Sequence, residues 1–247
     1  MSFRPPHYRV LSCASLARAV YAAAARSAAV VTVEILEQGL HDRPVRLRVE
    51  LQKRIDSCEQ ADLDAVLLGY GLCGAATAGL VAGSVPLVMA RAHDCITLHL
   101  GSRERYDREF ETCPGTYWMS RDFLERNRRG DVATLGVSPT GFQELCDKYG
   151  PENAVYLAEA MQGWVAQYQR LVYLEGTTPE PAAYRAEVQE KAKRWRLAVE
   201  TRWSDHRLIE ALLSGDWGQE FLVVQPGGRI SVGDGQQIVT EQKASVR

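Results

Sequence analysis

The sequence predicts a doubly wound α/β fold with a mainly parallel sheet and a helical elaboration in its second half. Over residues 8–90, short apolar runs rich in β-branched residues alternate with helical patterns. The connections between these runs are short, which is typical of parallel strands joined by right-handed helical crossovers. Such an alternation indicates a Rossmann-like arrangement, with helices on both faces of the sheet.

The first half of the chain contains the clearest elements. Strands are expected at 8–13, 30–36, 64–69 and 86–90, and a helix over the alanine-rich stretch 14–26. A second helix is expected to begin near Pro44, because proline suits the first turn of a helix. Its buried stripe recurs at helical spacing and consists of Leu47, Leu51, Ile55 and Cys58.

The second half is less regular. Charged residues dominate 102–130, after which helices are expected at 142–149, 152–170 and 184–199, and strands at 171–175 and 221–225. The polar residues at the C-terminus predict no element. Because no repeat or linker divides the chain, we expect residues 1–247 to form a single α/β domain or two closely packed lobes, 1–100 and 101–247.

Composition and charge exclude several classes of protein. The formal net charge is −2, so no basic surface favours nucleic acid. The N-terminus lacks the apolar core of a signal peptide, and no stretch approaches the roughly 20 apolar residues of a membrane span. We therefore expect a cytoplasmic protein whose six cysteines are reduced. No CxxC pair occurs, so any cysteine site must be assembled from distant segments.

Cysteines and histidines gather where the first four expected strands end. Strand 8–13 ends at Cys13, and the second strand leads into a turn that contains His41. The third strand leads to Cys73, and the fourth to His93 and Cys95. The carboxyl ends of parallel strands share one edge of the sheet, which is where ligands bind in such folds. We therefore expect these side chains to form one site.

Three interpretations of this cluster compete. In the first, Cys73, His93 and Cys95, with Cys13 or His41, hold zinc, iron or an iron–sulfur cluster, since thiolate and imidazole suit these metals. In the second, Cys73 or Cys95 is a nucleophile and His93 is its base. In the third, the cysteines are small buried apolar residues.

Gly69, Gly71 and Gly74 match the dinucleotide-binding pattern G-x-G-x-x-G. That motif normally follows the first strand and opens a full helix, whereas here it follows the third strand and precedes a short connection. We therefore interpret these glycines as residues that let the backbone approach a ligand closely or that hold Cys73 in a tight turn.

Further substrate-binding candidates are Arg43 and Arg91, which could hold an anionic group, and Tyr70 and Tyr117, which could contact a small molecule. Exposed arginines more often have no binding role. Tyr117 could equally have a structural role and pack its loop against the core. Three other residues are expected to have no role in the site: Cys58 and Cys146 on apolar helix faces, and His99 at the surface.

The chain resembles a bacterial and archaeal family of unknown function. The similarity lies in residues 39–44 (GLHDRP), 68–74 (LGYGLCG), 91–96 (RAHDCI), 101–102 (GS) and 114–118 (PGTYW). Members of that family occur beside corrinoid-dependent methyltransferase systems, so the resemblance implies a setting of metal cofactors and methyl transfer. It covers the first half of the chain and implies no particular reaction.

Together these observations predict a protein that binds a metal or metal cofactor and serves methyl-transfer or corrinoid metabolism. One alternative is a cysteine-dependent enzyme that acts on a small molecule at the same site. Another is a non-catalytic accessory subunit that docks a corrinoid protein.

Overall fold

The computed structural model describes residues 4–37, 40, 43–58, 62–126, 145–157, 167–176 and 178–242. The chain divides into two compact units. The first combines Met1–Tyr106 with Ser204–Arg247, and the second is Asp107–Trp203. Each unit has its own sheet, and the candidate site lies in the first.

The sheet of the first unit has five strands in the order β2-β1-β3-β4-β8. Their bounds are β1 (His7–Cys13), β2 (Val30–Leu36), β3 (Ala65–Gly69), β4 (Leu87–Ala90) and β8 (Phe221–Val224). The first four strands are parallel, and β8 pairs with β4 in the antiparallel sense. This confirms the predicted mainly parallel α/β sheet and the strand positions expected from the sequence.

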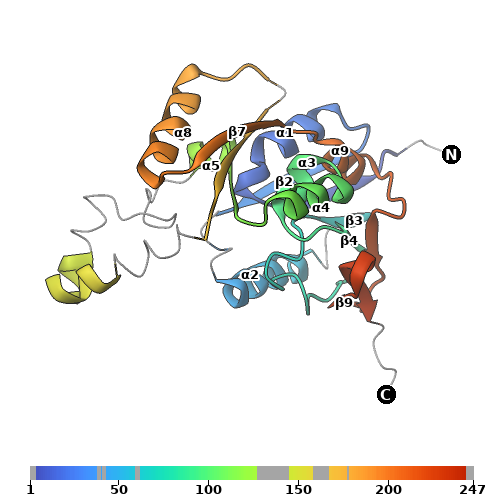
Figure 1. The fold of residues 1–247 in the computed structure, drawn as a ribbon. Helices are drawn as coiled ribbons and strands as arrows, with labels where there is room; N and C mark the ends of the chain where they lie inside the picture. The colour runs from blue at the N-terminus through green and yellow to red at the C-terminus, as the bar shows by residue number, and fades with distance from the viewer. Residues whose placement is uncertain are drawn as a thin grey trace. The chain divides into compact units, whose positions relative to one another are not determined.

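Helices cover both faces of this sheet, as predicted. The short helix η1 (Ala14–Leu16) leads into α1 (Ala17–Arg26), which packs on one face together with α9 (Arg207–Ser214). The opposite face is covered by α2 (Pro44–Asp56). Figure 1 shows α2 below the strands and α1 and α9 above them. Two helices follow β4, namely α3 (Cys95–Leu100) and α4 (Arg103–Thr112).

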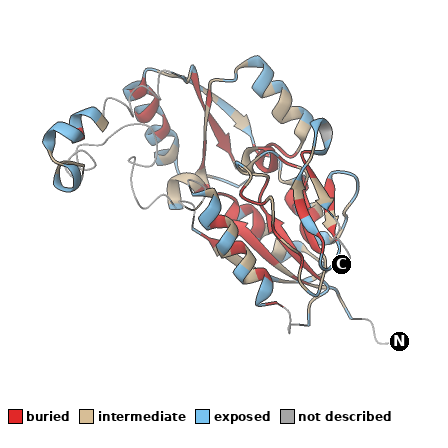
Figure 2. Ribbon diagram, turned by 90° about the horizontal axis from the view of Figure 1, so that it is seen from below, coloured by how far each residue is buried: buried red, intermediate tan, exposed pale blue. Residues whose placement is uncertain are grey.

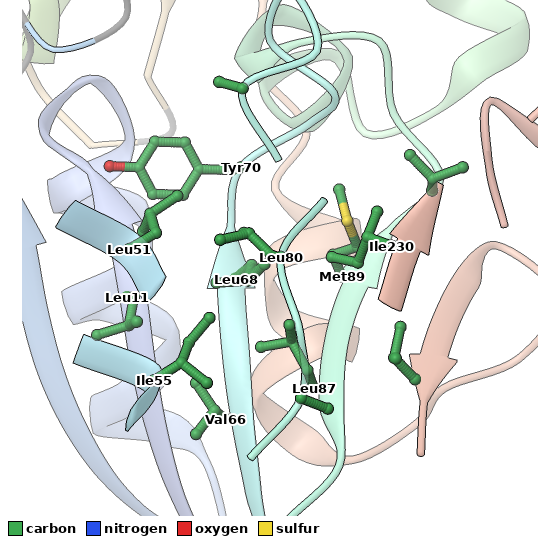
Figure 3. Packing of buried hydrophobic residues seen from close by; sticks show 14 of the residues in the cluster. Leu11, Leu51, Ile55, Val66, Leu68, Tyr70, Leu80, Leu87, Met89 and Ile230 are labelled. Carbon is green, nitrogen blue, oxygen red and sulfur yellow. The ribbon is translucent and has the colours of Figure 1, made fainter. Parts of the chain in front are cut away.

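The two faces of the sheet form two separate apolar clusters. Val66 and Leu68 of β3 point into the cluster under α2, whereas Ala65 and Leu67 point into the cluster under α1 and α9. Figure 3 shows the first of these clusters, where Leu51 and Ile55 of α2 meet Leu68. Every residue of β3 is buried, because a central parallel strand is covered on both faces.

The C-terminal segment of the first unit contains elements that the sequence analysis did not predict. A hairpin is formed by β9 (Arg229–Val232) and β10 (Val239–Gln242), with the short helix η4 (Gly235–Gln237) in its loop. Only Ile230, Ile238 and Val239 of this segment are buried apolar residues. With so few apolar residues, the segment shows almost no alternation of apolar and polar positions. The hairpin could therefore not be predicted from the sequence.

The second unit contains helices, as expected, and also a parallel sheet of its own. The strands β5 (Thr116–Ser120), β6 (Arg170–Glu175) and β7 (Ala198–Trp203) lie in that order. The helices are α5 (Arg121–Arg126) and α8 (Ala182–Trp195), together with the helical residues 145–149 and 151–157. Figure 2 shows that buried residues are concentrated in the strands of the two sheets.

Two sequence-based boundaries in the second unit were wrong or incomplete. The helix expected over 184–199 ends at Trp195, because Arg196 takes a left-handed conformation (φ 56°) that stops it, and Val199 lies in β7. The helix expected over 152–170 does not reach residue 170, because Arg170 begins β6, and residues 142–144 and 158–166 of the helices expected at 142–149 and 152–170 lie outside the described residues.

Candidate functional site

The site lies where the strand order of the first sheet reverses. The chain runs from β1 outward to β2 and then returns to β3 on the other side of β1, so β1 and β3 flank a topological switch point. Ligands bind beyond the carboxyl ends of the strands at such points. The strands that end there carry Cys13 at the end of β1 and lead to Cys73 after β3 and Cys95 after β4.

The turns after β3 and β4 are held together by backbone hydrogen bonds. The amide of Leu72 donates to the carbonyl of Ala92, and that of Cys73 to the carbonyl of His93, both at 2.8 Å. A Cβ atom on Gly71 would lie 2.6 Å from the amide nitrogen of Asp94, so only glycine permits this approach. Gly71 therefore serves the close packing of two turns, and residues 70–86 form turns rather than the helix of a dinucleotide site.

The turn that carries Cys73 is strained. Cys73, Gly74 and Ala75 have φ angles of 47°, 62° and 65°, so three successive residues have positive φ, and two of them, Cys73 and Ala75, carry side chains. The guanidinium of Arg48 donates to the carbonyl of Ala75 at 2.7 Å and supports this conformation. Strained backbone persists where the surrounding structure enforces it, and it concentrates at functional sites.

The structure brings three of the predicted cysteines together. The thiols of Cys13, Cys73 and Cys95 interact electrostatically in every pair. The backbone amides of Gly71 and Cys95 lower the pKa of the Cys73 thiol and so oppose the larger effect of burial. The hydroxyl of Ser15 donates to the sulfur of Cys13 at 3.2 Å and lowers the pKa of the Cys95 thiol. We call Cys13, Cys73 and Cys95 the thiol cluster.

Burial of their thiols keeps Cys73 and Cys95 protonated. Removal from water raises the pKa of both Cys73 and Cys95 well above the usual range of a thiol, and neighbouring Asp94 and Cys13 add to the effect. A thiol in this state is a poor nucleophile at neutral pH. It becomes a thiolate only when a bound cation takes the place of its proton.

Asp94 joins the two turns to the helix that follows. Its carboxylate caps α3 by accepting from the amides of Ile96 (2.9 Å) and Thr97 (3.3 Å). The hydroxyl of Tyr106 donates to the same carboxylate at 3.2 Å. Burial raises the pKa of Asp94, while these hydrogen bonds oppose that rise. Asp94 thus fixes the backbone that carries Cys95.

The remaining predicted ligands are placed differently. The side chain of His93 is exposed and stacks on the ring of Tyr106, with 5.5 Å between the ring centres. His41 lies outside the described residues. In the part of the chain that is described, no group of three or more His, Cys, Asp or Glu side chains has the arrangement of a preformed metal site. The ligand roles of these residues therefore stay predictions.

The four substrate-binding candidates occupy four different settings. Arg43 is exposed immediately before α2. Arg91 is half-buried and donates to the carbonyls of Gln237 (3.2 Å) and Val239, so it ties the C-terminal hairpin to the end of β4. Tyr70 is buried beside the thiol cluster. Tyr117 belongs to the second unit, where its ring meets those of Tyr168 and Trp195 edge-on.

Sequence reasoning missed Ser15 and misplaced His99. His99 is 3% exposed rather than superficial, and its Nε2 atom lies 2.9 Å from the carbonyl oxygen of Ser15. It therefore supports the turn that carries Ser15 and Cys13. No signal in the sequence marks Ser15, because a serine two residues after a strand is common.

The fold and the site define a doubly wound α/β protein with a thiol cluster at its switch point. A family model described as "Protein of unknown function (DUF1638)" matches residues 35–213, which is more than half of the chain. The chain belongs to this family, which confirms the expected membership of a family of unknown function. The matched segment includes Cys73 and Cys95 but not Cys13.

No curated protein and no solved structure matches the chain significantly. Within the described residues, none of the helices has both the length and the apolar character needed to cross a membrane.

Proposed function

We propose that this protein binds a thiophilic metal, as zinc, iron or an iron–sulfur cluster, through the thiolates of Cys13, Cys73 and Cys95. The observation that carries the proposal is the mutual electrostatic interaction of three thiols that come from three separate strand ends near the switch point. A nucleophile requires one thiol, whereas soft metal centres require several. His93 and His41 are the candidates for a further ligand from the protein.

The donors around the thiol cluster favour its conversion into a metal centre. Three thiolates would accumulate negative charge, which hydrogen bonds to sulfur disperse. The amides of Gly71 and Cys95 already favour the thiolate of Cys73, and Ser15 favours that of Cys95 and donates to the sulfur of Cys13 at 3.2 Å. Because the free thiols are protonated, metal binding must release protons, and the affinity should rise with pH.

A cysteine nucleophile is the competing proposal. Nucleophilic cysteines often have a strained backbone and nearby amides that lower the pKa of the thiol, and Cys73 has both. Two observations weigh against it. The raised pKa of Cys73 leaves the thiol unactivated, and the imidazole of His93 is exposed and stacked on Tyr106 rather than buried with the thiol.

The methyl-transfer setting is part of the proposal and rests on the resemblance described above. A metal held by thiolates could bind a thiol substrate and lower its pKa. The resulting thiolate would be a suitable acceptor for a methyl group. An accessory protein that docks a corrinoid protein would carry the same metal site without turnover. The two roles share the metal centre, so metal binding is the property to test first.

Metal titration of protein purified without oxygen or chelators tests the proposal. We expect the native protein to bind zinc or cobalt stoichiometrically, with protons released in step, as measured by a pH indicator. Cys73→Ala and Cys95→Ala should each lower the metal affinity by at least about 100-fold, because each removes a direct ligand.

The matched control is Cys58→Ala. Cys58 is buried at the end of α2, where its thiol donates to the carbonyl of Arg54 at 3.2 Å, so the change alters the core and spares the thiol cluster. Its metal affinity should equal that of the native protein. Native protein that binds no metal, and in which one cysteine is alkylated far faster than the others, would establish the nucleophile instead.

A further inference from the structure

The strand β7 is an open edge of the sheet in the second unit. That sheet has the order β5-β6-β7, and within the described part of the chain β7 pairs with β6 alone. The outer backbone groups of an edge strand can pair with a strand of another chain, so proteins usually shield such edges. In β7, however, Val199 and Trp203 are 42% and 63% exposed. An edge with exposed apolar side chains is a candidate for strand addition.

One face of β7 carries these exposed side chains. Val199 is in register with Leu171 of β6, which packs under α8. Because side chains alternate along a strand, Val199, Thr201 and Trp203 all lie on this same face of the sheet. All three are exposed, since the apolar cluster under α8 takes its described residues from β5 and β6 and not from β7. This face of β7 is therefore available to another molecule.

The opposite face of β7 carries one acidic and one basic side chain, Glu200 and Arg202. Ion pairs hold both in place. The guanidinium of Arg202 donates to the carboxylates of Glu200 at 2.7 Å and Glu109 at 2.6 Å. Arg170 also donates to Glu200, at 3.0 Å. Both side chains still reach solvent, with exposed fractions of 38% for Glu200 and 28% for Arg202. Each can therefore meet an opposite charge from outside the chain.

We propose that two copies of this chain associate through β7, which pairs with itself in the antiparallel sense about a two-fold axis at Thr201. In such a pair, residues equally far from Thr201 lie directly opposite each other. Glu200 then faces Arg202 of the second copy on one side of the sheet, and Val199 faces its Trp203 on the other. Unlike charges, apolar pairs and paired threonines all stabilise neighbouring strands. The inference does not depend on the proposed metal site.

The order of the charges favours this register and a second copy as the occupant. Pairing centred on Glu200 or on Arg202 would place two like charges opposite each other, which destabilises a sheet. A two-fold interface requires a surface that is complementary to itself, and the segment 199–203 meets this requirement about its central residue. Because the paired segment is short, we expect a reversible dimer rather than a permanent one.

Charged substitutions at Thr201 test the pairing. The side chain of Thr201 is exposed, so Thr201→Lys and Thr201→Glu leave the ion pairs on the opposite face in place. Analytical ultracentrifugation of native protein should show dimers whose fraction rises with concentration. Each variant alone should raise the dimer dissociation constant at least about tenfold, because two like charges then meet at the axis. An equal mixture of the two variants should form dimers again, since opposite charges meet there.

The matched control is Val30→Lys. Val30 is 49% exposed on β2, an edge strand of the other sheet, and the variant should dimerise as native protein does. Native protein that stays monomeric up to its solubility limit would overturn the inference. So would an unchanged dissociation constant in Thr201→Lys, or loss of the dimer in Val30→Lys, since either would place the interface elsewhere. A mixture of the two Thr201 variants that stays monomeric would exclude a two-fold axis at this residue.

Discussion

We expect Gly71→Ala to lower the free energy of unfolding by about 3 kcal/mol, the upper range for overpacking a tight interior. The new Cβ would lie 2.6 Å from the amide nitrogen of Asp94 and 2.8 Å from the carbonyl oxygen of Ala92. Both atoms belong to the backbone, so no side chain can rotate to relieve the clash. The turns after β3 and β4 would have to separate, which would break the 2.8 Å hydrogen bonds that Leu72 and Cys73 donate. Urea denaturation measures the loss.

The control for this change is Gly74→Ala, three residues further along the same turn. The nearest atom to its new Cβ is Cγ of Pro44 at 3.9 Å, so the change creates no clash. Its φ of 62° imposes only the usual strain of a left-handed alanine, about 1 kcal/mol. Gly71→Ala should also reduce metal affinity, because it moves Cys73 away from Cys95. Equal stability of the two variants would show that the turns are not held by their close approach.

The sheet of the first unit could be predicted because its strands are strongly patterned. The run Ala65–Gly69 is uniformly apolar, and the spacing of Leu47, Leu51 and Ile55 defines the helix that covers it. In β7, by contrast, Val199 and Trp203 are exposed. The alternation of buried and exposed residues in β7 is weak, so the sequence pattern places Val199 in the preceding helix. Of the three strands in this sheet, only the buried β6 could be predicted, whereas the exposed β7 has too little periodicity to be recognised.

The sequence could predict which residues of the site lie close together, because the topology of the sheet determines this, but it could not predict how their side chains point. Parallel strands end at one edge, so the proximity of Cys13, Cys73 and Cys95 follows from strand order. Side-chain direction after a strand depends on the local turn, and no sequence rule gives the left-handed φ of Cys73. For the same reason the sequence could not show that the exposed ring of His93 stacks on Tyr106, although Cys95 lies only two residues further along the chain.

The stability of this protein should fall steeply in mild acid because of His99. Burial, together with neighbouring His206, lowers the pKa of His99 to about 3. In the unfolded chain a histidine has a pKa of about 6.5, so the unfolded state takes up a proton first as the pH falls. The stabilising effect of the neutral imidazole is complete above about pH 6.5 and is lost as the pH falls towards about 3. Between about pH 7 and about pH 4.5 this amounts to about 2.5 kcal/mol.

His99→Gln isolates this contribution from that of other titrating groups. Carboxylates paired with arginine, such as Glu34 and Glu109, also lose stability in acid, so native protein and variant must be compared at both pH values. The glutamine amide can still donate to the carbonyl of Ser15 but does not titrate. Urea denaturation should therefore show a smaller loss of stability in the variant, by about 2.5 kcal/mol.

The exposed His93 provides a control for the His→Gln change itself, since His93→Gln leaves the buried ring of His99 and its contact with Ser15 in place. The surroundings of His206 include Asp205, Glu210 and Arg26, so its own titration adds a smaller change that native protein and His99→Gln share. An unchanged acid dependence in His99→Gln would mean that water or another group reaches the ring in the folded state. In that case the turn of Ser15 and Cys13 would not be held by a neutral imidazole, and the thiol cluster would lose one of its supports.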